Sequence, residues 1–94
     1  MAVILGRRDN PHELKCWPDS FNAIWYSGKR SEVRRDDRGG FEAGQFLRLR
    51  EWDPATKAYT CQLLLVQIMH VERGLQVGIQ EGFVVLTIHP VEVT

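Results

Sequence analysis

The alternation of apolar and polar residues predicts a chain built mainly of strands. In the segment 45–52 leucines alternate with arginines, which is typical of a strand with one buried face. The segment 59–72 is apolar on both faces over much of its length, so both faces of this strand are expected to be covered. Further strands are predicted at 12–16, 31–35 and 83–93, with a short candidate at 2–5, a hairpin turn at 53–57 and a bulge or strand exit at Pro90.

One helix is predicted after the strand at 12–16. Pro18 suits the first helical turn, and Asp19 or Ser20 can cap the exposed N–H groups. Gly28 can adopt the left-handed conformation that ends a helix. The apolar positions at helical spacing are Phe21, Ala23, Ile24 and Trp25. A helix of about nine residues is unstable alone, so it must pack on the sheet.

This order of elements predicts one α+β domain in a chain of 94 residues. We expect a small, mostly antiparallel β-barrel of about five to six strands, closed or nearly closed, with the helix over one opening. Residues 1–11 are interpreted as an N-terminal lead-in and 12–94 as the domain. Since no segment has the roughly 18 apolar residues of a membrane span, and 1–5 is too short for a signal peptide, a cytoplasmic location without a membrane partner is expected.

The two cysteines, Cys16 and Cys61, have neither the spacing of a metal site nor that of a disulfide framework. Both are expected to be reduced, and Cys61, beside an apolar run, is expected in the core. His12 and Cys16 are four residues apart, but in a strand this spacing places them about 13 Å apart, which is too far to share a metal ion. We therefore expect neither a metal nor a cofactor.

Charge changes this picture only when it is divided along the chain. Twelve basic residues cancel twelve acidic ones, which argues against broad coating of nucleic acid. Residues 29–50, however, carry seven basic and four acidic groups, and residues 51–94 carry two and five. The net charge is thus +3 in one segment and −3 in the other, which leaves room for one local basic site.

The basic segment contains a carboxylate between cations. In an extended strand Arg30, Glu32 and Arg34 share one face, while Val33 and Arg35 share the other, and Val33 is expected to point inward. A carboxylate between two guanidinium groups is held in position and kept ionised. Such a set can bind a phosphate or a base edge, or it can simply tie strands together.

Other residues could add chemistry to this site. Trp17 and Trp52 stand beside predicted element ends, where a partly exposed ring could stack an unpaired base, or they could fill the core as Trp25 is expected to do. Lys29 follows the helix end near Glu32 and could act as a nucleophile if it were desolvated.

A set of motifs in a fixed order resembles a known family. They are HELK at 12–15, SGKR at 27–30, EVR at 32–34, DR at 37–38, FEAG at 41–44, LREWDP at 49–54 and GIQEGFVVL at 78–86. Together they look like the ASCH family of the PUA-like superfamily, and within it like a small branch of unknown function from bacteria and their phages. The resemblance covers residues 12–89.

The resemblance implies a PUA-like barrel with a helix beside a cleft, and RNA or a modified nucleoside as the ligand. By position, Lys29, Glu32 and Arg34 would line the cleft and Glu81 would approach from the last loop. Some ASCH relatives remove acyl groups from acetylated cytidine with a Lys, a Thr and a Glu. Lys29 matches the lysine, Glu32 stands at the threonine position, and Glu81 is the counterpart of the glutamate. Other relatives are proposed ribonucleases, for which His12 or Lys29 would supply acid–base chemistry.

The leading hypothesis is therefore a module that binds RNA or a nucleotide, as a monomer or weak dimer. Phosphates would be held by Arg30, Arg34, Arg35 and Arg38, the ligand would be recognised by Lys29 and Glu32, and Trp17 or Trp52 would stack a base. An ionised Glu32 would keep Lys29 protonated, which weakens the alternative of a Lys-dependent amidohydrolase with Lys29, Glu32 and Glu81 as catalytic residues. A phage protein that binds a host protein is the third hypothesis.

Overall fold

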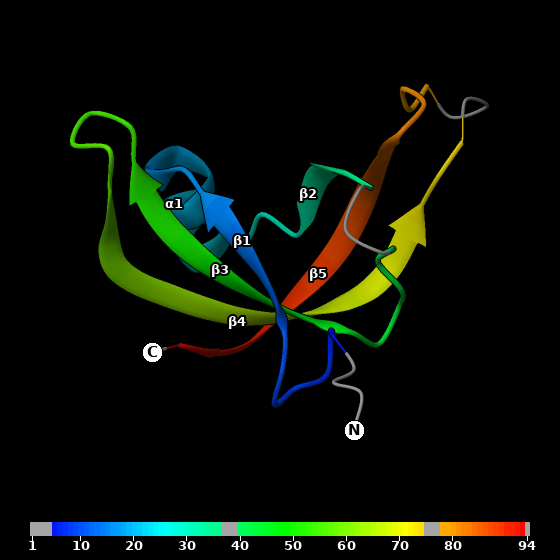
Figure 1. Cartoon of the computed structure of the whole chain (residues 1–94), viewed down its shortest axis with the longest axis horizontal. Helices are drawn as coiled ribbons and strands as arrows, with labels where there is room; N and C mark the ends of the chain where they lie inside the picture. Colours follow the sequence, from blue (N-terminus) through cyan, green and yellow to red (C-terminus); the bar gives the residue numbers. More distant parts are fainter. Residues whose placement is uncertain (1–4, 37–39, 75–77, 94) are drawn as a thin grey trace.

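A computed structural model describes residues 5–36, 40–74 and 78–93 as five strands and one helix (Figure 1). The elements are β1 (His12–Cys16), α1 (Pro18–Tyr26), β2 (Ser31–Arg35), β3 (Phe46–Asp53), β4 (Ala58–Glu72) and β5 (Phe83–Val93). Their order and, to within a residue or so, their bounds are as the sequence predicts. Of the strand candidate at 2–5, residues 2–4 lie outside the described residues and Leu5 lies in a turn.

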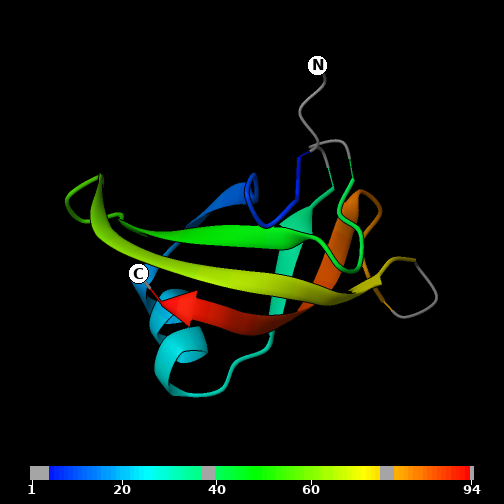
Figure 2. The ribbon, with the colours of Figure 1, turned by 90° about the horizontal axis from the view of Figure 1, so that it is seen from below.

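The five strands form one sheet in the order β1-β3-β4-β5-β2. β1 runs parallel to β3, and all other neighbours are antiparallel. Figures 1 and 2 show that the sheet curls strongly into two arms, which are joined by the long strands β4 and β5. The predicted α+β class and strand number are confirmed, and the sheet is a half-barrel whose two edge strands are β1 and β2.

Register shifts in the ladders accompany the curl. They occur in β3 between Arg50 and Trp52 and in β4 at two places, one of which faces Pro90. An extra residue on one strand of a pair bends that strand and increases its twist. The bulge predicted at Pro90 is therefore confirmed, and it belongs to the curvature that brings the two arms toward each other.

The core lies on the inner face of the curled sheet. Its buried side chains are Leu14, Cys16, Phe21, Ile24, Phe41, Leu47, Leu49, Leu64, Val66, Ile68, Val84, Leu86 and Ile88. Cys61, which was expected in the core, is exposed. It has φ +73° opposite the register shift of β3, so the chain turns its side chain outward although the apolar run follows directly. The position of Cys61 next to a buried apolar run in the sequence therefore did not predict its exposure.

The helix α1 packs against β3 on the inner face. Trp17 is the residue that caps it, with extended backbone and no side-chain hydrogen bond, so the prediction that Asp19 or Ser20 caps it is wrong. Gly28 has φ +77° and follows the last helical turn, as predicted. Within the described part of the chain, no helix has the length and apolar character needed to cross a membrane.

Candidate functional site

The most unusual feature of the inner face is a buried carboxylate between two cations. Glu32 is only 6% exposed. Its Oε1 accepts hydrogen bonds from Ser20 Oγ at 2.7 Å and from Lys29 Nζ at 2.9 Å, and its Oε2 accepts one from Arg34 Nη2 at 3.0 Å. Lys29 Nζ also donates to Ser20 Oγ at 2.5 Å, which closes a ring of three polar groups. We call Ser20, Lys29, Glu32 and Arg34 the Glu32 cluster.

Three parts of the chain assemble this cluster. α1 supplies Ser20, the segment after Gly28 supplies Lys29, and β2 supplies the other two members from alternate positions of one face. Glu32 pairs with the buried Leu86 of β5, so its side chain enters the inner face of the sheet. The prediction that Val33 points inward is wrong, because Val33 is 62% exposed. Hydrogen bonds from residues outside β2 offset the cost of burying the Glu32 carboxylate. The alternation of residues within β2 does not predict these bonds.

The surroundings of Glu32 fix its charge. Burial by itself would raise the pKa of this carboxyl, but the hydrogen bonds from Ser20 and Lys29 and the charge of Arg34 outweigh burial and lower the pKa below its ordinary value. Glu32 is therefore ionised at neutral pH. The buried thiol of Cys16, at the end of β1, is influenced by the same groups: burial and the negative charge of Glu32 raise its pKa, so it is protonated.

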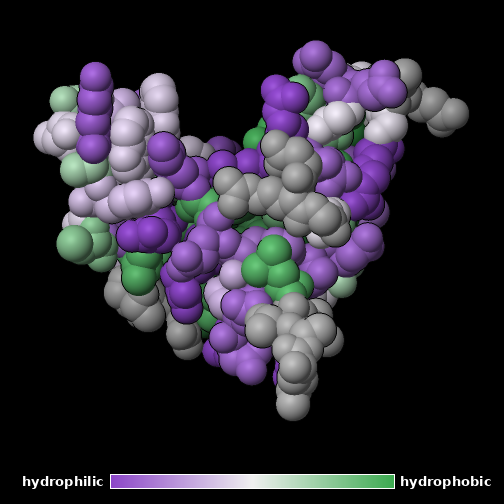
Figure 3. Space-filling model, viewed as in Figure 1, coloured by the Kyte–Doolittle hydropathy of each residue, from purple (hydrophilic) through white to green (hydrophobic). Residues whose placement is uncertain are grey.

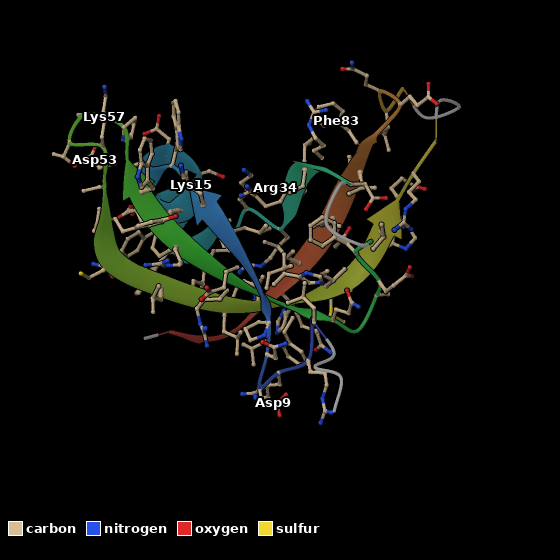
Figure 4. All side chains as sticks on the ribbon, in the orientation of Figure 1. Asp9, Lys15, Arg34, Asp53, Lys57 and Phe83 are labelled. Atoms are coloured by element: carbon tan, nitrogen blue, oxygen red, sulfur yellow. The ribbon has the colours of Figure 1, made fainter. Side chains whose placement is uncertain are left out.

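Arg34, one member of the cluster, lies beside a hollow between the two arms. Figure 3 shows a notch in the surface between the arm that carries α1 and the arm that carries β2 and the ends of β4 and β5. In Figure 4 the side chain of Arg34 extends from β2 into the space between these arms. Its Nε is buried and has no hydrogen-bond partner. A buried donor without a partner costs about 1–3 kcal/mol, so a rearrangement of the Arg34 side chain that brought Nε to an acceptor in the notch would be favourable.

Comparison with known families adds one finding. Residues 11–88 match the model of a family that is described as Domain of unknown function (DUF3850). The chain belongs to this family. A search of curated proteins finds no match. The matched region of the DUF3850 family begins just before β1 and ends within β5, so it includes every member of the Glu32 cluster.

Two other arginines of the predicted phosphate set have different positions in this DUF3850 domain. Arg30 donates from Nη1 to the backbone oxygens of Ile24 at 3.1 Å and Lys29 at 2.9 Å, so it satisfies one carbonyl in the last turn of α1 and one in the segment that follows. Arg35 lies on the outer face of β2, with its guanidinium 5.0 Å from the ring centre of Phe83. Arg38 lies outside the described residues.

The structure does not bring Glu81 to the cluster. Arg35, the last residue of β2, pairs with Phe83, and Glu81 lies beyond this end of the strand in an exposed turn. Lys29 precedes the other end of β2. Because the strand itself spans about 13 Å, the backbones of Lys29 and Glu81 lie at opposite ends of it. The triad implied by the resemblance is therefore incomplete in this DUF3850 domain.

The aromatic and histidine candidates also differ in where they lie and in how exposed they are. Trp17 is 58% exposed and directly follows Cys16, so it is close to the Glu32 cluster along the chain. Trp52 is half-buried, and Lys15 Nζ lies 4.2 Å from its ring centre. Trp25 packs against the core, as expected. His12 is buried, and its Nε2 lies 2.8 Å from Gln45 Oε1, which makes it part of the core packing.

Sequence reasoning missed two groups near Glu32. The sequence predicts Ser20 only as a candidate helix cap, and Cys16 only as a reduced cysteine outside any metal site or disulfide. The signal for Cys16 was present, because the alternation in 12–16 places it on the inner face at the strand end that leads into α1. In the described ranges, His, Cys, Asp and Glu side chains form no group of three or more that could hold a metal ion.

Proposed function

We propose that this DUF3850 domain is a PUA-like module of the ASCH type that binds RNA, or a nucleotide-sized part of it, in the notch beside the Glu32 cluster. The observation that carries the proposal is the buried, unpartnered Nε of Arg34 next to an ionised carboxylate and an ammonium group. The motif resemblance at 12–89 supports the choice of RNA as the ligand. The half-barrel with one helix is compatible with this fold.

The chemistry of the cluster suits a ligand that is rich in acceptors. Lys29, Glu32 and Arg34 together carry a net charge of +1. Arg34 has five N–H donors, of which the Nη2 bond to Glu32 uses one and Nε is unused. A phosphate oxygen or a base carbonyl can accept from these donors, while Glu32 holds both cations in place. The exposed ring of Trp17 offers a surface on which an adjacent base could stack.

The same contacts weigh against Lys29 as a nucleophile. Its amine donates hydrogen bonds to Glu32 Oε1 and to Ser20 Oγ, so Nζ is held within the Glu32 cluster. Hydrolysis of an acylated nucleoside would also need a second carboxylate near the amine, and Glu81 is at the other end of β2. We therefore expect binding without turnover.

The test measures binding of a fluorescently labelled single-stranded RNA of ten nucleotides by anisotropy. Arg34→Gln removes a charged hydrogen bond of about 1.5–3 kcal/mol, so we expect Kd to rise about 10- to 100-fold. Lys57→Gln, at the tip of the β3–β4 turn (Figure 4), removes one positive charge far from the notch and is the matched control. Equal affinity of both variants and the unchanged protein would contradict the proposal. So would hydrolysis of acetylated cytidine that Lys29→Ala abolishes.

A further inference from the structure

A second basic hollow lies on the outer face of the sheet. It has a volume of about 600 Å³ and is lined by Arg8, Glu13, Arg48, Arg50, Cys61, Leu63 and Leu65. Its lining on β3 and β4 alternates along the strands with core residues such as Leu49 and Leu64, which face the other side. The Glu32 cluster is on the inner face. The outer hollow, as we name it, is therefore a separate site.

The outer hollow is positively charged. Three arginines and one glutamate line it, which gives a net charge of +2. Arg48 Nη1 donates to Glu13 Oε1 at 3.0 Å, and the structure gives Arg50 no ion pair within the described part of the chain. Arg50 instead lies with its guanidinium carbon 3.9 Å from the ring centre of Tyr59. This contact with the ring leaves N–H donors of the guanidinium without a hydrogen-bond partner within the described residues, and these donors can bind an anion.

Apolar side chains form the rest of the hollow. Leu63 and Leu65 lie on β4, where they contribute to the outer face, and Leu65 is 7% exposed. Hollows of roughly 300–1,000 Å³ that combine an apolar floor with a few polar groups are typical of small-molecule sites. A ligand that fits must combine an anionic group for the arginines with a flat, weakly polar part for the leucines.

We propose that the outer hollow binds one nucleotide of a single-stranded nucleic acid. The phosphate would contact Arg48 and Arg50, and the base would lie on Leu63 and Leu65. A nucleotide fits better than an acidic peptide, because one residue of such a peptide carries a carboxylate but no flat apolar group. The proposal takes its ligand class from the proposed function, but its site and its residues are different.

Cys61 provides a direct measurement of occupancy. It is exposed and lines the outer hollow, whereas Cys16 is buried and its raised pKa keeps the thiol protonated. The neutral reagent iodoacetamide should therefore alkylate Cys61 selectively in the folded full chain. We expect uridine 5′-monophosphate to slow this alkylation in a saturable way. Arg50→Gln, which leaves the ion pair of Arg48 and Glu13 intact, should weaken the protection constant about tenfold.

Two variants separate this site from the notch. Arg34→Gln and Lys57→Gln should keep the protection of Cys61 by the nucleotide, and thermal unfolding shows whether each variant is folded. Protection with the unchanged affinity in Arg34→Gln would support the outer hollow even if the RNA-binding test at the notch fails. Loss of protection in Arg34→Gln would assign the nucleotide to the notch and overturn the proposal.

Three comparison probes complete the test. Inorganic phosphate at equal concentration should protect Cys61 less than the nucleotide does, because it lacks a base. Equal protection by phosphate would reduce the outer hollow to an anion site and overturn the role of the leucines. Protection by a tetraglutamate peptide but not by the nucleotide would assign the surface to an acidic protein partner. No protection by any probe would also refute the proposal.

Discussion

Substitution of the buried carboxylate of Glu32 tests most directly whether the Glu32 cluster stabilises the fold beside the notch. Glu32→Gln keeps the size and shape of the side chain but removes its charge. Both cations of the Glu32 cluster then lose their ion pair, and the amide NH₂ of the new side chain must face either Arg34 or Lys29 as a donor against a donor. We expect a folded but less stable protein.

The size of the effect follows from burial. Removal of one partner from a buried ion pair costs about 3–5 kcal/mol. The side chains of Lys29 and Arg34 are 36% and 22% exposed, so water can partly solvate both cations, and we expect the lower end of this range, about 3 kcal/mol. In a domain of this size, such a loss lowers Tm by about 12–24 °C.

Urea denaturation at pH 7, followed by circular dichroism, measures this loss. The control is Glu42→Gln, because Glu42 has a 70% exposed side chain that lies 4.0 Å from Arg73, and we expect a loss below about 0.5 kcal/mol. The m-value should stay unchanged in both variants, since neither alters the surface exposed on unfolding. If Glu32→Gln costs no more than Glu42→Gln, the carboxylate does not hold α1 and β2 together, and our account of the cluster is wrong.

Three further predictions concern other parts of the structure. The pKa of Glu32 is lower in the folded chain than its ordinary 4.5. The stability that Glu32 contributes is therefore fully present above pH 4.5 and is lost as pH falls through the folded pKa. Urea titrations at descending pH should show a steeper loss of stability for the unchanged protein than for Glu32→Gln. Ellman's reagent should react with one thiol in the native state, Cys61, and with Cys16 only in urea; rapid reaction of both would contradict the burial of β1. Gly6→Ala should lower stability by more than about 1 kcal/mol in a thermal melt, because φ is +99° and the added Cβ would meet a side-chain atom of Gln45 at 2.8 Å. Gly44→Ala is the control: its φ is +93°, but its Cβ would meet no atom, so we expect a smaller loss of stability.

The elements were predictable because their signals are local. The alternation in β3, the apolar run in β4 and the stop at Gly28 each depend on a few neighbouring residues, and their bounds agree with the structure. The errors arose where one residue depends on distant ones. Val33 faces outward because Ser20 and Lys29, from other elements, stabilise the carboxylate beside it.

The candidate site was predictable only in part for the same reason. Alternation along β2 placed Glu32 and Arg34 on one face, and the structure brings both together with Lys29. The net charge of +3 in residues 29–50, however, combined two sites, because Arg34 faces the inner side and Arg48 and Arg50 line the outer hollow. A sum over sequence cannot show that a curled sheet separates these arginines.

The order of strands has a consequence for what joins the two arms on either side of the notch. β1 and β2 are the two edges of the sheet, and each pairs with one neighbour only. Where a closed barrel would have a ladder of backbone hydrogen bonds between its edges, this domain has side chains: the contacts of Ser20 and Lys29 with Glu32 join α1 to β2. These contacts act together with the shared hydrophobic core and the bond of Arg30 to Ile24. The polar side chains among them can exchange partners with an incoming ligand while every strand pair of the sheet stays intact.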